Sequence, residues 1–153
     1  MARRNRAAAR LAAVQALYQM DVASKGLNDV LAEFESFWMG QTVEGVEYEP
    51  ADKALFRDIV QGVLDDQLGI DRTTNAALSD RWPLRRVEAV MRAVLRAGTY
   101  ELRAREDIPA RVVIAEYVDV AGAFLADDET GMVNAVLDHI ARGLRSAEFE
   151  KRA

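Results

Sequence analysis

The chain has 153 residues, of which 50% are hydrophobic and 29% are charged, and its formal net charge at pH 7 is −5. This balance favours a globular domain over a disordered chain, and the length fits one domain. The sequence has no cysteine and one histidine, which excludes disulfides, thiolate metal sites and zinc sites that need two histidines. No apolar run approaches the ~20 residues of a membrane span, and the polar start lacks a signal-peptide core. We therefore expect a soluble cytoplasmic protein.

Hydrophobic residues recur with helical spacing along almost the whole chain. Glycines and prolines mark the boundaries: Gly69 is expected to end a helix, and Pro83 and Pro109 are suited to the first turn of the next one. Residues 40–50 are expected to form the one substantial loop. In chain order, we expect helices over roughly residues 3–24, 27–38, 51–68, 71–80, 83–105, 110–124 and from 127 onwards.

The order of these helices predicts the fold class. Seven helices with short connections indicate an all-α bundle, with three helices packed against four. We accordingly divide the chain into an N-terminal helical subdomain, residues 1–69, and a C-terminal helical subdomain, residues 70–153.

Positive charge is concentrated in two stretches of this acidic chain. Residues 1–20 contain four arginines and no acidic residue, and residues 72–111 contain nine arginines against five acidic residues. Arg3, Arg6 and Arg10 have the spacing i, i+3 and i+7, which places them along one stripe of a helix. Arginine binds phosphate oxygens and stacks on bases, and a local basic field attracts nucleic acid whatever the total charge. Two interpretations stay open: an RNA-binding edge, or a solvated N-terminus whose arginines only maintain solubility.

The remaining chemistry-bearing residues do not indicate an enzyme. The sequence contains neither a Gly-rich phosphate loop nor a Gly-x-Ser-x-Gly elbow. The three acidic residues 127–129 are better explained by capping of a helix start than by a metal site. Tyr18 can stack on a base or fill the core, and His139 receives no role. We expect no catalytic residue, no metal and no cofactor.

Five stretches of the sequence resemble one known family. They are Arg10–Gln19, Asp58–Val63, Leu95–Pro109, Val113–Tyr117 and Met132–Asp138. Together and in this order they resemble the NusB family of bacterial transcription antitermination factors. The family usually has Asn, Lys and Phe where this chain has Ala115, Gly131 and Met132. At Gly131 and Met132 this chain therefore lacks one cation and one aromatic ring that the family usually provides along the RNA.

The resemblance implies a fold and a function. NusB-like proteins have two roughly perpendicular helical subdomains and catalyse no reaction. They pair with NusE, a small-subunit ribosomal protein, and the pair binds the single-stranded boxA element of nascent RNA. The assembly joins the RNA polymerase antitermination complex, so that ribosomal RNA operons are read through terminators. Some NusB-like proteins also form homodimers, and we expect a monomer–dimer equilibrium here.

Carried over position by position, the resemblance implies two sets of site residues. The expected RNA-binding residues are Arg3, Arg4, Arg6, Arg10, Gln15, Tyr18, Arg96, Phe124 and Asp128. The expected NusE-binding residues are Glu88, Met91, Arg92, Pro109, Ala110 and Arg111. The competing hypothesis is a helical protein-interaction adaptor that does not bind RNA.

Overall fold

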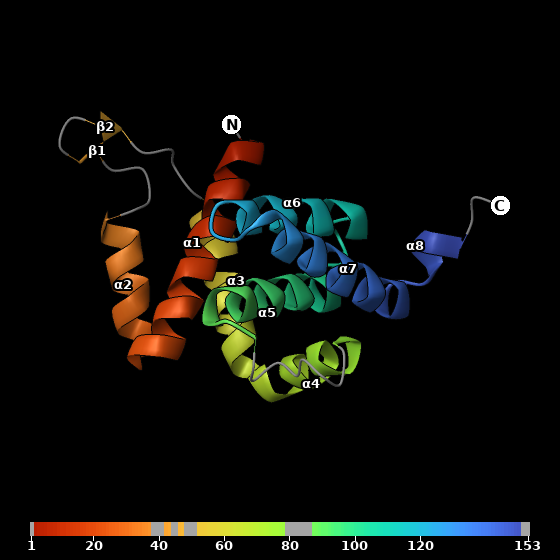
Figure 1. Ribbon diagram of the computed structural model, residues 1–153. Coiled ribbons are helices and arrows are strands. Elements are labelled where there is room, and N and C mark those ends of the chain that lie inside the picture. The colour runs from red at the N-terminus through yellow and green to blue at the C-terminus, as the bar shows by residue number, and fades with distance from the viewer. Residues whose placement is uncertain (1, 38–41, 44–45, 48–51, 79–86, 151–153) are drawn as a thin grey trace.

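The computed structural model describes residues 2–37, 42–43, 46–47, 52–78 and 87–150 (Figure 1). The helices within these ranges are α1 (Ala2–Ala23), α2 (Leu27–Phe37), α3 (Lys53–Asp65), α4 (Gln67–Ala77), α5 (Ala89–Ala104), α6 (Ala110–Gly122), α7 (Asp127–Leu144) and α8 (Ala147–Glu150). Two short strands, β1 (Thr42–Val43) and β2 (Val46–Glu47), pair antiparallel inside the segment expected to be a loop. The predicted all-α class is confirmed, and none of the described helices has the length and hydropathy needed to span a bilayer.

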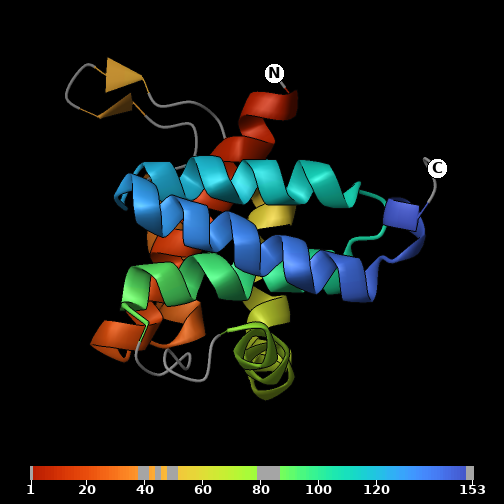
Figure 2. The same cartoon turned by 45° about the vertical axis from the view of Figure 1, so that its right-hand side comes forward.

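Helix α5 lies at the centre of the molecule and contacts α1, α3, α4, α6 and α7. Helices α1 and α3 run steeply across α5, α6 and α7, which lie side by side (Figures 1 and 2). The expected crossing of two helical groups is therefore present. The buried side chains of both groups form one hydrophobic core, so the boundary between residues 69 and 70 stays a prediction. The largest fully buried side chains include Phe56, Ile59, Leu95, Tyr117 and Leu137.

The break between α3 and α4 lies at Asp66, and the prediction that Gly69 ends the third helix is wrong. Asp66 leaves the helical conformation, with φ −145° and ψ 50°, and its carboxylate accepts a hydrogen bond of 3.2 Å from the Gly69 amide. A side chain at Gly69 would collide with this carboxylate. Gly69 therefore lets Asp66 fold back over the first turn of α4 and cap it.

Helix α5 begins at Ala89, six residues after the predicted start at Pro83. Pro83 itself lies outside the described residues. Val87 and Glu88 are not helical: Glu88 has φ −57° and ψ 149°, and the carbonyl of the buried Val87 accepts a hydrogen bond of 2.8 Å from the Arg92 guanidinium. The chain therefore enters α5 in an extended conformation.

Arg145, just after α7, fixes the far end of α5. Its buried guanidinium donates to the carbonyl oxygens of Glu101, Leu102, Arg105 and Ile108, at 3.2, 2.8, 2.8 and 2.8 Å. The last carbonyls of a helix have no partner within the helix, and a buried helix end needs one from elsewhere. Arg145 supplies these partners and so holds the turn between α5 and α6.

The close approach of α3 to α5 at Gly62 gives a testable prediction about stability. A methyl group at Gly62 would collide with the ring of Tyr100, whose hydroxyl donates a 2.6 Å hydrogen bond to Asp58. We expect Gly62→Ala to lower the free energy of unfolding by about 1–3 kcal/mol despite the better helix propensity of alanine. Gly131→Ala, in open space on α7, is the control and should raise it by about 0.5–1 kcal/mol. Urea denaturation measures both, and a neutral Gly62→Ala would contradict the packing described.

Candidate nucleic-acid interface

The N-terminal turns of α1 carry exposed positive charge. They extend beyond α6 at the edge of the molecule (Figure 2). The Arg6 side chain is exposed, and no carboxylate in the described part of the chain pairs with it. Arg3 and Arg4 lie one turn earlier on the same helix, and their side chains fall outside the described residues. The solvated cation that the sequence predicts is therefore present at Arg6.

Arg10 is buried, and the prediction that it belongs to an exposed arginine row is wrong. Only 2% of the residue is exposed. Its Nε and Nη2 atoms donate to the two carboxylate oxygens of Glu101 at 2.8 and 3.0 Å, and Nη1 lies 3.5 Å from Glu116. The physical reason is that α1 packs against α5 and α6, so the stripe turns inward one helical turn after Arg6.

Tyr117 completes the cluster around Arg10. Its hydroxyl donates a 2.5 Å hydrogen bond to Glu101, and the Arg10 guanidinium lies 6.0 Å from the ring centroid. Burial, and then the negative charge of Glu101, raise the pKa of Tyr117 well above 10. Burial by itself would lower the pKa of Arg10. The hydrogen bond and the negative charge of Glu101 have the larger combined effect, so the pKa of Arg10 is raised. The cluster is thus a charged Arg10 beside a neutral phenol, and it joins α1 to α5 and α6.

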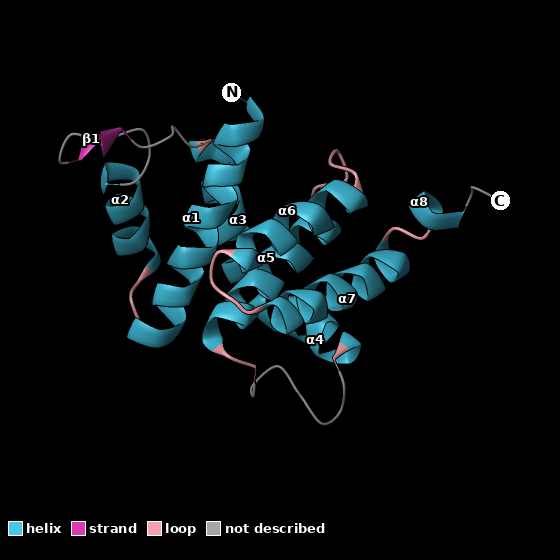
Figure 3. Cartoon of the chain, turned by 45° about the horizontal axis from the view of Figure 1, so that its top comes forward, coloured by secondary structure: helices cyan, strands magenta, loops and turns pink. Residues whose placement is uncertain are grey.

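Two aromatic rings of the predicted RNA surface are exposed. Tyr18 is 37% exposed and Phe124 is 39% exposed, so Tyr18 is not a core residue. Gln15 is half-buried. The turn after α6, which contains Phe124, lies beside α1 (Figures 1 and 3). These rings give a surface on which unpaired bases can stack.

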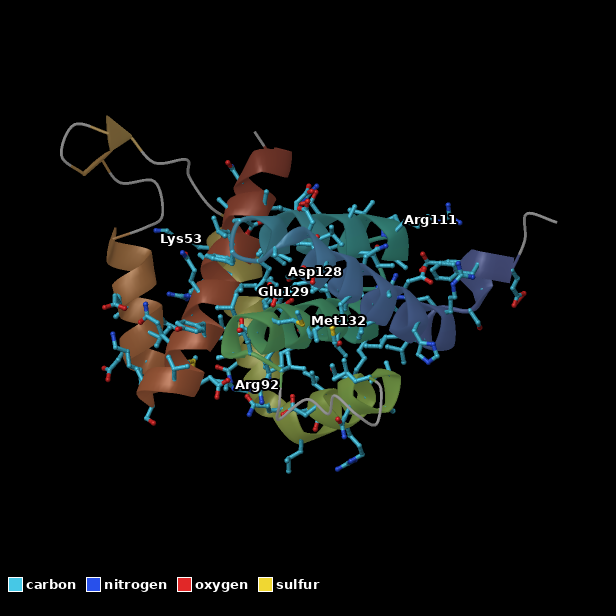
Figure 4. The ribbon with its side chains drawn as sticks, in the orientation of Figure 1. Lys53, Arg92, Arg111, Asp128, Glu129 and Met132 are labelled. Atoms are coloured by element: carbon cyan, nitrogen blue, oxygen red, sulfur yellow. The ribbon has the colours of Figure 1, made fainter. Side chains whose placement is uncertain are left out.

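The start of α7 adds negative charge to the same side of the molecule. Asp128 is exposed, and Figure 4 shows it beside Glu129 in the first turn. The Glu129 carboxylate accepts a 3.1 Å hydrogen bond from the amide of Ala126, so the predicted capping role is confirmed at this position. Asp128 can accept a hydrogen bond from a base amino group, while its charge repels phosphate.

Arg96 does not provide a free cation. The prediction that its charge neutralises phosphate at the RNA-binding edge is therefore wrong. Its guanidinium forms two 2.8 Å hydrogen bonds with Asp71 on α4 and lies 3.5 Å from Asp21 at the end of α1. Only 11% of its side chain is exposed. The two carboxylates neutralise Arg96, which serves to hold α1, α4 and α5 together.

A groove between α1 and α6 was missed by sequence reasoning. It has a volume of about 590 Å³ and is open to solvent. We call it the α1–α6 groove, and its charged lining residues are Arg6, Arg10, Arg105, Asp107, Arg111 and Glu116. Its two sides come from segments about a hundred residues apart, so no local pattern could reveal it.

The residues expected to bind NusE do not form one surface. Met91 and Ala110 are buried, with 4% and 0% of each residue exposed. Glu88 and Arg92 lie at the beginning of α5, whereas residues 109–111 follow its end. A helix of 16 residues is about 24 Å long, and Figure 4 shows Arg92 and Arg111 on opposite sides of the molecule. The burial of Met91 and Ala110 contradicts their predicted contact with NusE, and the other four residues, at opposite ends of α5, stay predictions.

The buried position of Arg10 predicts a large effect on stability. We expect Arg10→Met to lower the free energy of unfolding by about 3–5 kcal/mol, because it leaves the Glu101 carboxylate buried without its partner. The matched change Arg6→Met, on the exposed part of the same helix, should alter it by less than about 0.5 kcal/mol. Urea denaturation compares the two variants. Equal effects would mean that Arg10 is not buried in solution.

The raised pKa of Tyr117 predicts a loss of stability at alkaline pH. Above pH ~10 an unfolded tyrosine releases its proton while folded Tyr117 keeps it, so the free energy of unfolding falls as pH rises. Tyr117→Phe removes this contribution and should make the fall shallower by up to about 1.4 kcal/mol per pH unit. Tyr100, whose pKa is raised to about 12, contributes equally in both proteins. Denaturation between pH 9 and 12 is the measurement, and identical slopes would contradict the prediction.

Comparison with known sequences identifies relatives along nearly the whole chain. Residues 7–142 match the NusB family. Transcription antitermination protein NusB of Bradyrhizobium sp. strain BTAi1 is 64% identical over 144 residues, which cover 94% of this chain and 85% of that protein. The protein of the same name from Nitrobacter winogradskyi is 62% identical over 146 residues, covering 95% of this chain and 91% of that protein.

Solved structures show the same fold. NusB from T. maritima matches with a TM-score of 0.76 and 30% sequence identity, covering 94% of this chain and 95% of that one. A chain in the crystal structure of antitermination factors NusB and NusE in complex with dsRNA matches with a TM-score of 0.74 and 23% identity, covering 92% and 98%. On the combined evidence of sequence and fold, the chain belongs to the NusB family.

Proposed function

We propose that this chain is a transcription antitermination factor that binds boxA-type single-stranded RNA together with NusE, and so promotes read-through of ribosomal RNA operons. Its curated relatives carry the name transcription antitermination protein NusB at 61–64% identity. A structure of similar fold is described as antitermination factors NusB and NusE in complex with dsRNA. The observation in this chain that carries the proposal is the exposed Arg6, free of any described carboxylate, on the protruding end of α1. The role is binding and not catalysis.

The chemistry of the surface suits a single strand. Arginine neutralises phosphate, and the exposed rings of Tyr18 and Phe124 can hold unstacked bases. Asp128 suits a base amino group rather than a phosphate, which favours recognition of particular bases over non-specific binding. Few cations are free, because Arg10 and Arg96 are paired with carboxylates. A partner that adds contacts is therefore needed for tight binding.

The wider partners remain proposals supported by the family. Of the residues expected to bind NusE, Glu88, Pro109 and Arg111 are exposed and available to a partner. Entry into an RNA polymerase antitermination complex, a monomer–dimer equilibrium and a cytoplasmic location are further parts of the proposal.

Salt dependence of RNA binding tests the role of α1. Because Arg10 is buried, α1 has three arginines that can contact phosphate. Together they should contribute about −2 to the slope of the logarithm of the RNA association constant against the logarithm of the salt concentration, for a single strand. Arg6→Ala should flatten the slope by about 0.7, measured with NusE at saturation and a boxA oligonucleotide. Arg72→Ala, an exposed arginine on α4 at the other end of the molecule, is the control and should leave the slope unchanged.

A scrambled oligonucleotide separates the two functional hypotheses. The RNA-binding factor should prefer boxA over the scrambled sequence, and NusE should strengthen that preference. A helical adaptor should bind both oligonucleotides equally poorly, with or without NusE. That second outcome would remove RNA from the function of this chain.

A further inference from the structure

We propose that the α1–α6 groove is an RNA subsite, in which one phosphodiester of the bound strand lies between Arg6 of α1 and Arg111 of α6. The inference rests on the proposed function and extends it from Arg6 to Arg111, which is outside the predicted RNA-binding set. Both arginines line the same groove of about 590 Å³. Clefts of roughly 300–1,000 Å³ hold small organic ligands, so one nucleotide fits.

The charged residues that line the groove are four arginines and two carboxylates, Asp107 and Glu116, and each carboxylate is paired with an arginine. Arg105 donates to Asp107 at 3.1 Å and to Asp58 at 3.0 Å, and these contacts raise its pKa although burial opposes its charge. Arg10, at the inner side of the groove, is paired with two glutamates as described above. The positive charges of Arg10 and Arg105 are therefore already neutralised by carboxylates and do not attract a further anion.

Arg6 and Arg111 are the two cations that stay free. Both side chains are exposed, and no carboxylate in the described ranges lies within ion-pair distance of either. They come from different helices and lie on one groove, so an anion between them receives a guanidinium from each side. A phosphodiester has the charge and the oxygen geometry for this arrangement.

The C-terminal segment places Arg111. The Arg111 guanidinium lies 5.8 Å from the centroid of the Phe149 ring, whose other neighbour is Arg142 at 4.7 Å. A ring restrains a guanidinium without neutralising its charge. The first amide of α6, at Ala110, is already bonded to Glu148 at 2.8 Å. The anion must therefore be held by side chains and not by that amide.

The walls of the groove favour the backbone of a strand over a stacked base. Pro109, Val112 and Ala115 line it and are exposed, with Val112 43% exposed, and none of them carries an aromatic ring. Such a wall accepts the apolar side of a sugar. Arg3 and Arg4 precede Arg6 in the sequence of α1, and several cations on one helix suit a regularly charged strand better than an isolated acidic side chain.

The experiment compares single and double variants of the full chain, with NusE at saturation and a boxA oligonucleotide. Arg111→Ala should flatten the salt slope by about 0.7, and Arg6→Ala with Arg111→Ala should flatten it by about 1.4. Arg142→Ala is the matched control, because Arg142 contacts the same Phe149 ring but pairs with Asp138 outside the groove, and it should keep the wild-type slope. Unfolding midpoints of all variants verify that the fold is retained.

Two outcomes would overturn the subsite. One is an Arg111→Ala slope equal to that of the wild type while Arg6→Ala behaves as proposed. The other is an unchanged slope together with weaker binding of NusE in the absence of RNA, which would assign the groove to the protein partner. Failure of the proposed function gives a different result, since the wild-type chain itself would then not distinguish boxA from the scrambled oligonucleotide.

Discussion

A buried ion pair between Arg10 and Glu101 determines how the rest of the molecule is arranged. Removing two charges from water costs several kcal/mol for each ion, which only close and well-oriented contacts can offset. The two-pronged contact of 2.8 and 3.0 Å meets this requirement, and Tyr117 supplies a further hydrogen bond to the same carboxylate. The pair therefore fixes the rotation of α1 about its axis relative to α5 and α6. Arg6, one turn earlier, is placed beyond the packed region and stays in water.

A second constraint acts at the opposite end of α5. Arg145 binds the last carbonyls of that helix, and Glu148 holds both Arg145, at 2.8 Å, and the first amide of α6. The turn between α5 and α6 is thus fixed by the end of the chain. The α1–α6 groove exists because Arg10 positions one side of it and Arg145 positions the other.

Pairing of charges decides which arginines are available to a ligand. Arg10, Arg96 and Arg105 each bond to two carboxylates, so they contribute to packing and not to the field around the protein. Arg6 and Arg111 keep their charge exposed. An acidic protein can therefore present a small positive surface to RNA, and the few free cations explain why a partner belongs to the proposed function.

The periodicity of apolar residues determined the all-α class and most helix boundaries, because that signal is local and repeats many times. The same reasoning misplaced the end of α3, since the capping of α4 by Asp66 depends on a carboxylate that folds over Gly69. The same reasoning also placed Arg10 on the surface, because its spacing puts it on the same face of the helix as Arg6. Only the packing of α1 on α5 and α6 shows that this face is buried at Arg10. Whether a cation is free or neutralised depends on acidic residues far away in the sequence, and tertiary structure alone brings those residues into contact.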